Sequence, residues 1–173
     1  IITFKANPEY FDSLDINIQE LSHLVKAKSI LQPKLKLKLI DEKHGSGTQE
    51  FYHDGSLSDY LIGANTPSTD YLPNGTYHGT IDGDTYVLDW SAIWLPESTE
   101  PLQESYVNLI PTMYGGTHVN AFRTGLIDSM REFCDRRNLL PRNIKLSPED
   151  IWKNVSFILS FKMSNPQFSG QTK

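Results

Sequence analysis

Apolar residues recur every three or four positions in two stretches of the chain, which predicts two amphipathic helices. The first covers residues 16–30 and ends before Pro33. The second runs from Gly115–Gly116 to about residue 138; at ~20 residues it would be roughly 30 Å long. Its apolar positions are Val119, Phe122, Leu126, Met130, Phe133 and Cys134. Shorter helices are predicted over residues 56–61 and from Ser147, a capping residue followed by a proline.

Alternating and β-branched stretches between these helices predict strands. Residues 34–39 alternate strictly between lysine and leucine and form a hairpin with residues 49–53. The lysine row suits a solvated face or a protected sheet edge better than a nucleic-acid surface. A second hairpin is predicted from residues 77–81 and 85–95. Single strands are predicted over residues 1–4, 106–110 and 156–163.

The order of these elements predicts an α+β fold with one mixed sheet and helices on one face. The length of 173 residues fits a single domain spanning 1–173. Because the chain starts on a strand-like segment without Met, we expect it to be part of a longer protein. The single cysteine, Cys134, excludes an internal disulfide and lies on an apolar helix stripe, which indicates a packed, inert thiol. No apolar run approaches the ~18 residues that span a membrane.

Charge is unevenly distributed along the chain. The net charge of −5 argues against a general nucleic-acid binder. Residues 1–116 carry 7 basic and 16 acidic side chains, a net of −9, whereas residues 117–173 carry 9 and 5, a net of +4. An anionic partner would therefore be sought in the last third of the chain, although ordinary surface variation explains the difference equally well.

No complete active site is evident from the residues alone. None of the five histidines stands at metal-ligand spacing from another histidine or a cysteine, so we expect no metal site. Gly115–Gly116 could let a ligand approach the backbone, but a tight strand-to-helix turn explains the pair better. The run from Asn165 to Lys173 is small, polar and turn-prone and could bring a cation to an anion; by composition it is more typical of a solvated loop.

Four segments of the chain are informative together: Tyr106–Asn108, Gly115–His118, Ser147–Ile151 and Asn165–Lys173. They resemble segments of the second domain of the B subunits of type II topoisomerases. Asn165 departs from the Asp of many members without preventing the turn. Met130–Cys134, Leu140–Arg142 and Glu149–Trp152 are similar to the B subunit of bacterial topoisomerase IV, the ParE family, more than to gyrase.

The resemblance implies a transducer domain that follows an ATP-binding domain of the GHKL type and precedes metal-binding and DNA-gate regions. The implied fold is that of the second domain of ribosomal protein S5. It contains a left-handed βαβ crossover, an exception to the usual handedness. Here the crossover would consist of strand 105–110, the long helix and strand 156–163.

The resemblance also implies roles for individual residues. The loop 166–173 would reach the ATP site of the neighbouring domain, where Gln171 and Lys173 contact the γ-phosphate and Lys173 assists hydrolysis. Arg123 would line the cavity through which DNA passes. The residues here lack the general-base Glu and the glycine-rich lid of the family. ATP and Mg²⁺ would thus be held mainly by the neighbouring domain, with none expected on this fragment, which alone would be inactive.

The implied partners are DNA, the A subunit of topoisomerase IV (the ParC family) and a second copy of the B subunit in a heterotetramer. No membrane is involved, and the location would be the cytoplasm, at the nucleoid. Two alternatives stay open: the same domain of the gyrase B subunit, and an S5-like nucleic-acid-binding module without ATPase activity. An upstream GHKL site would exclude the last.

Overall fold

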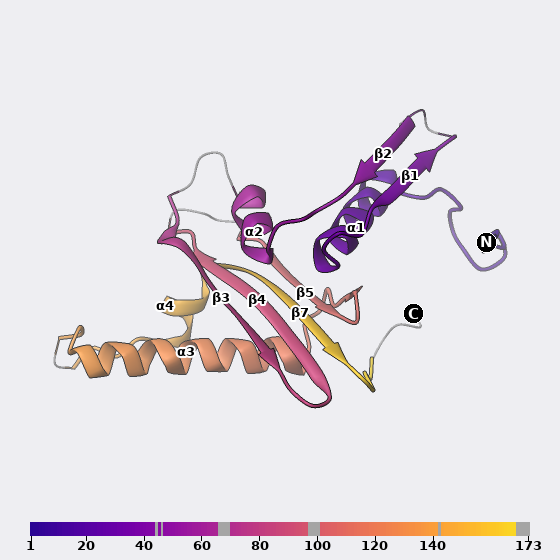
Figure 1. Ribbon diagram of the computed structural model, residues 1–173. Helices are drawn as coiled ribbons and strands as arrows, with labels where there is room; N and C mark the ends of the chain where they lie inside the picture. The colour runs from indigo at the N-terminus through magenta and orange to yellow at the C-terminus, as the bar shows by residue number, and fades with distance from the viewer. Residues whose placement is uncertain (44, 46, 66–69, 97–100, 142, 169–173) are drawn as a thin grey trace. The chain divides into compact units, whose positions relative to one another are not determined.

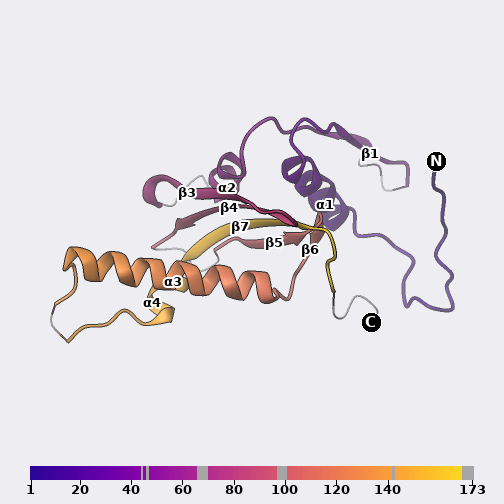
Figure 2. The ribbon, with the colours of Figure 1, turned by 60° about the horizontal axis from the view of Figure 1, so that its bottom comes forward.

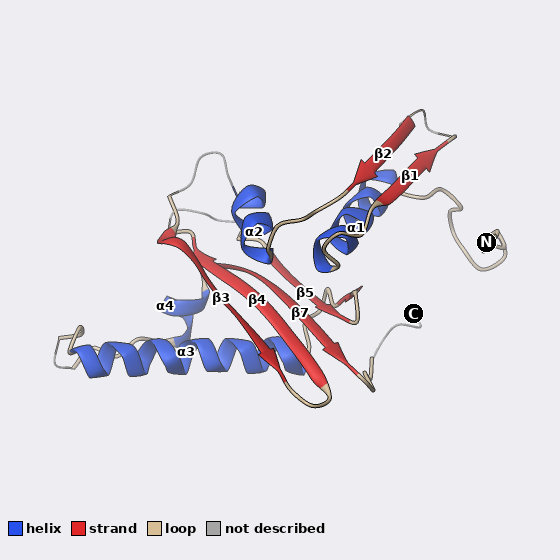
Figure 3. Ribbon diagram, in the orientation of Figure 1, coloured by secondary structure: helices blue, strands red, loops and turns tan. Residues whose placement is uncertain are grey.

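The computed structural model describes all residues except 44, 46, 66–69, 97–100, 142 and 169–173. The chain divides into two compact units, Ile1–Asp54 and Gly55–Lys173. The single domain expected for residues 1–173 stays a prediction. Figure 3 shows helices and strands in both units.

The first unit is a helix on a hairpin. Helix α1 (Ile18–Leu31) begins at Asn17, whose side chain accepts hydrogen bonds from two backbone amides of the first turn. Strands β1 (Leu37–Asp41) and β2 (Gly47–Phe51) are antiparallel, as predicted. Residues 1–4 form no strand; the prediction was wrong because β-branched residues make a strand only where another strand pairs with them, and no described segment does.

The second unit is built around a five-stranded sheet with the order β3-β4-β7-β5-β6. Strands β5 and β7 are parallel and the other neighbouring pairs are antiparallel, so the predicted mixed sheet is confirmed. The elements are α2 (Leu57–Asn65), β3 (Leu72–Asp82), β4 (Tyr86–Trp94), β5 (Gln103–Val107), β6 (Ile110–Pro111), α3 (Thr117–Arg137), α4 (Pro148–Trp152) and β7 (Val155–Met163).

The connection from β5 to β7 is the predicted crossover. It runs through β6, α3 and α4 before returning parallel to β5. In Figures 1 and 2 the helices of this connection lie on one side of the sheet, and the crossover is left-handed. Helix α3 is 21 residues long and ends at Asn138 in the left-handed conformation. The predicted α+β class is therefore confirmed.

Helices cover both faces of this sheet. Phe157 and Leu159 of β7 belong to a core cluster that contacts α3 and α4. Ser156 and Ile158 alternate with these residues and point to the opposite face of the sheet. There Ser156 Oγ donates to Asn65 Oδ1 of α2 at 3.0 Å. Figure 2 shows α2 and α3 on opposite sides of the sheet. The expectation of helices on one face holds for α3 and α4. Helix α2 covers the second face, so β7 is buried on both faces.

The predicted strand 106–110 is interrupted. Asn108 and Leu109 have φ values of 48° and 67°, so the chain turns there and β6 folds back on β5. A five-residue β-like pattern cannot reveal such a turn when neither residue is glycine. Helix α3 also departs from its predicted stripe, because Phe133 is 51% exposed whereas Ile127 is buried. Cys134 is buried, as predicted.

Replacing Leu159 by alanine should lower the free energy of unfolding of the chain by about 2–5 kcal/mol, since Leu159 is fully buried at the centre of β7. Denaturant unfolding would measure this loss. Ile144→Ala serves as the control, because Ile144 is 56% exposed. Equal losses in the two variants would contradict the central position of β7.

Candidate functional site

The C-terminal loop leaves the sheet from a fixed point at the end of β7. The side-chain amide of Asn108 donates to the carbonyl oxygen of Met163 at 2.9 Å, and its Oδ1 accepts from the Met163 N–H at 2.9 Å. On the other side, the Ser164 N–H donates to the Thr85 carbonyl oxygen at 3.3 Å. The start of the loop is therefore attached to the turns next to both neighbouring strands, after β5 and before β4. Gln171 and Lys173 lie outside the described residues, so their phosphate contacts stay predictions.

The second stretch singled out in the sequence, Gly115–Gly116, is a tight turn into α3. The φ values are 72° and 153°, which favour glycine. A Cβ at Gly116 would lie 3.0 Å from the ring of His118, so a larger residue would push the ring aside. This confirms the interpretation of the glycines as a strand-to-helix turn.

His118 joins the start of α3 to β5 through a short chain of hydrogen bonds. Thr112 Oγ1 donates to the Ser105 carbonyl oxygen at 3.0 Å and lies 3.1 Å from His118 Nε2. Since that donation uses the only hydroxyl proton of Thr112, we assign a proton to Nε2, which donates to Oγ1. The ring also stacks on Phe161 with centroids 6.3 Å apart. Burial lowers the pKa of His118 below its usual 6.5, so the ring is neutral in the folded chain at pH 7.

The turn and the first residues of the loop line one cavity of about 470 Å³, although they are separated in sequence. Its lining residues include Gly115 and Gly116 of the turn and Pro166 and Phe168 of the loop. The structure thus brings together the two segments that the sequence pattern singled out independently.

Arg123 lies on α3 and is held from two directions. Its Nη2 donates to Glu149 Oε1 of α4 at 2.7 Å, and its guanidinium carbon is 5.4 Å from the centroid of the Trp152 ring. The side chain is 37% exposed, so solvent reaches part of the guanidinium. The cation is available to an external anion but already has a carboxylate partner, which sequence reasoning missed because the two residues are far apart in the chain.

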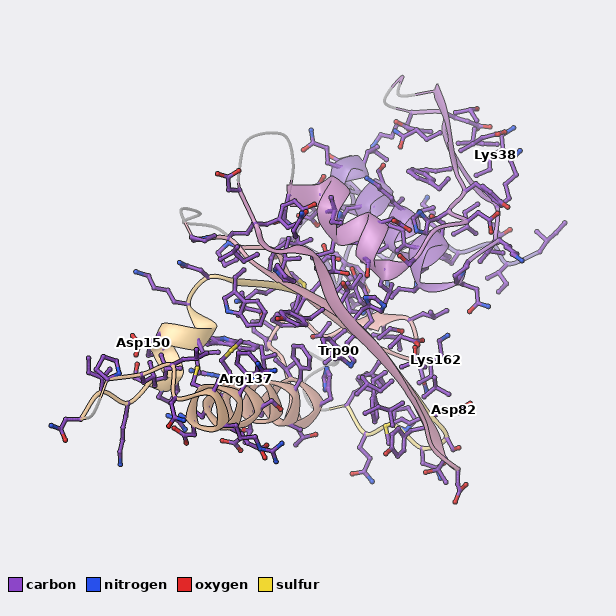
Figure 4. All side chains as sticks on the ribbon, turned by 60° about the vertical axis from the view of Figure 1, so that its left-hand side comes forward. Lys38, Asp82, Trp90, Arg137, Asp150 and Lys162 are labelled. Atoms are coloured by element: carbon purple, nitrogen blue, oxygen red, sulfur yellow. The ribbon has the colours of Figure 1, made fainter. Side chains whose placement is uncertain are left out.

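Helix α4 is held firmly in place. Ser147 accepts from the Asp150 N–H while the Asp150 carboxylate accepts from the Ser147 N–H, a reciprocal cap that also lowers the pKa of Asp150. At the other end, Trp94 Nε1 of β4 donates to the Ile151 carbonyl oxygen at 2.8 Å. The cap was predicted from the sequence. Figure 4 shows Asp150 on this helix and Arg137 on α3.

Between α3 and the sheet lies an apolar cavity of about 1000 Å³. Trp90 and Phe122 meet there with ring centroids 5.4 Å apart, and Figure 4 shows Trp90 on its strand above α3. The described residues that line it include His118 but no carboxylate, lysine, arginine or cysteine. The cavity therefore offers mainly packing surface and no pair of groups for acid–base chemistry.

The opposite face carries a polar cluster that the sequence did not indicate. Tyr60 and Tyr106 both donate to the carboxylate of Glu104, at 3.2 and 2.9 Å. Burial raises the pKa of both phenols, and the charge of Glu104 raises it further. The phenols stay protonated at neutral pH and fasten α2 to β5. Their role is structural, since the two phenols join separate elements through one shared carboxylate.

In the part of the chain that the structure describes, no three histidine, cysteine, aspartate or glutamate side chains gather as metal ligands would. Within the same residues, no helix is both long enough and apolar enough to cross a bilayer.

His118 should make stability depend on pH. Between its lowered pKa in the folded chain and the value of about 6.5 in the unfolded chain, only the unfolded state binds the proton, so stability falls as the pH decreases through this window. When the pH is lowered from about 7 to about 5, the free energy of unfolding measured with urea should fall less for His118→Gln than for the wild type. His78→Gln, at an exposed histidine, should keep the wild-type profile. Parallel profiles for wild type and His118→Gln would contradict this.

Residues 55–173 match the protein family described as DNA gyrase B. The chain is 49% identical to the B subunit of DNA topoisomerase 4 from Haemophilus influenzae over 173 residues, which are 100% of this chain and 27% of that protein. It is 48% identical to the protein of the same name from Pseudomonas aeruginosa, over 99% of this chain and 27% of that protein. The chain thus spans about a quarter of the length of these relatives.

A solved structure, the topoisomerase IV ATP-binding domain of Francisella tularensis in complex with a small-molecule inhibitor, has the same fold. The TM-score is 0.74 at 31% identity, over 96% of this chain and 44% of that one. The family match begins where the second compact unit begins, at residue 55. On these grounds the chain belongs to the DNA gyrase B family of topoisomerase B subunits.

Proposed function

We propose that this chain provides the transducer of a topoisomerase IV B subunit. It would couple ATP binding and hydrolysis in a neighbouring GHKL domain to the passage of one DNA duplex through another, in decatenation and relaxation. The observation that carries the proposal is the anchored start of the C-terminal loop beside the turn into α3. This arrangement links a loop that would contact nucleotide to a helix that would face DNA.

The loop supplies the groups that a terminal phosphate requires. Gln171 can donate through its amide and Lys173 through its ammonium group, which also offsets the phosphate charge. Within residues 165–173 of the sequence, Lys173 is the one cationic side chain. ATP with Mg²⁺, held by the neighbouring domain, supplies the free energy of the cycle. The residues of this chain would bind the γ-phosphate and lose that contact after hydrolysis.

The partners follow from the same proposal. DNA would meet α3 through nonspecific phosphate contacts at Arg123. The A subunit of topoisomerase IV and a second B subunit would complete a heterotetramer in the cytoplasm, at the nucleoid. The names of the relatives support topoisomerase IV over gyrase. Reconstitution with the A subunits of topoisomerase IV and of gyrase, followed by assays of decatenation and supercoiling, would distinguish the two.

Lys173→Gln in the intact protein should lower ATP turnover by about 10–100-fold, because a cation at the developing phosphate charge stabilises the transition state more than the bound nucleotide. Nucleotide affinity should change far less. Lys162→Gln, a change of the same charge on β7 before the loop, is the control. Full turnover in Lys173→Gln would contradict the role given to this residue.

Arg123→Gln should reduce the ratio of DNA-stimulated to DNA-free ATP turnover by about threefold to tenfold, since one phosphate contact is lost. The reduction should become smaller as salt is raised, because screening weakens the contact in the wild type. The control is Arg136→Gln: Arg136 forms an ion pair with Glu132 one turn away and is exposed near the end of α3. An unchanged ratio in Arg123→Gln would count against the DNA contact.

A further inference from the structure

The guanidinium of Arg123 has two different neighbours, and they act on it in different ways. The Trp152 ring packs against its apolar face, and Trp152 is itself fixed by Phe157, with ring centroids 5.2 Å apart. The Glu149 carboxylate occupies one of its N–H groups at 2.7 Å. The ring orients the cation without neutralising it, whereas the carboxylate occupies a donor that a phosphate would use.

Glu149 is the more solvent-exposed member of the pair. Its side chain is 74% exposed and that of Arg123 is 37% exposed. The carboxylate is therefore the more accessible partner, and an anion bound to Arg123 would lie beside it. Ion pairs this exposed contribute little to stability, so a phosphate can displace the carboxylate from its hydrogen bond.

After displacement, the carboxylate stays close to the bound phosphate. Glu149 is the second residue of α4, between Pro148 and the capping residue Asp150, and the Ile151 carbonyl is bonded to Trp94. The backbone that carries Glu149 is therefore fixed at both ends of this short helix. The side chain can rotate away from Arg123, but its charge stays within a Debye length of about 10 Å from a phosphate there and repels it.

We propose that Glu149 is a built-in competitor for the DNA phosphate at Arg123, which weakens the contact so that DNA binds α3 only transiently. The proposal rests on the DNA contact of Arg123 given above. A segment that must pass through an enzyme needs contacts that attract it and then release it. The pair of Trp152 and Glu149 would supply both, because the ring keeps the cation oriented while the carboxylate raises the rate of phosphate release.

The test uses the intact B subunit in complex with its A subunit and measures the concentration of duplex DNA that gives half-maximal stimulation of ATP turnover. Glu149→Gln should lower this concentration by about threefold to tenfold at low salt, since a competing charge is removed. The matched control is Glu132→Gln, which makes the same charge change on α3 and also removes an ion-pair partner, that of Arg136. It should change the concentration by less than about twofold.

The double variant Arg123→Gln/Glu149→Gln decides whether the effect passes through Arg123. The gain from Glu149→Gln should disappear in the Arg123→Gln background. An equal gain in both backgrounds would show a general charge effect and overturn the proposal. A loss in Glu149→Gln would also overturn it, since Glu149 would then hold Arg123 in a productive position.

Failure of the underlying function can be told apart from failure of this inference. If Arg123→Gln alone leaves stimulation by DNA unchanged, the DNA contact and the competition at that contact are both wrong. If Arg123→Gln weakens stimulation and Glu149→Gln behaves like Glu132→Gln, the DNA contact stands and the competition is wrong.

Discussion

Six consecutive side chains of β7, from Val155 to Ser160, are buried, so this strand needs cover on both faces and a hydrogen-bonded partner along each edge. Strands β4 and β5 provide the edges, α2 covers one face, and α3 with α4 covers the other. Because β5 is parallel to β7, the chain between them must return across the sheet, and α3 is the element that makes the return. The position of Arg123 and that of the loop after Met163 both depend on this one strand.

Much of this arrangement could be predicted from the sequence. The spacing of Val119, Phe122 and Leu126 located the long helix, and Ser147 with Pro148 located the start of α4, since both signals lie within a few residues of chain. Parallel pairing of β5 with β7 came from resemblance to a family and not from periodicity. The helix over residues 56–61 was predicted, but its place on the second face of the sheet was not, because the run of small and apolar residues in β7 shows burial without showing what provides it.

The interactions of the candidate site were less accessible to sequence reasoning. Arg123 could be singled out, but its contact with Glu149 joins two helices through a tertiary fold that local patterns do not contain. The turn at Asn108 was equally hidden, since Asn there resembles any polar residue within a strand. By contrast, Gly115–Gly116 was identified correctly as a turn, because glycine pairs before a helix have a direct conformational meaning.

Asn108 connects these observations. It sits in the turn between β5 and β6, and both polar groups of its side chain bind the backbone of the last residue of β7. Two hydrogen bonds therefore fix the end of β7 at the residue from which the loop departs. Met163 is held there through Asn108, and Ser164 is held by the Thr85 carbonyl oxygen, so the last two residues before the loop are bonded to the turns beside the sheet. A force on the residues that follow would therefore be shared between β7 and the β5–β6 turn, because Asn108 joins the two.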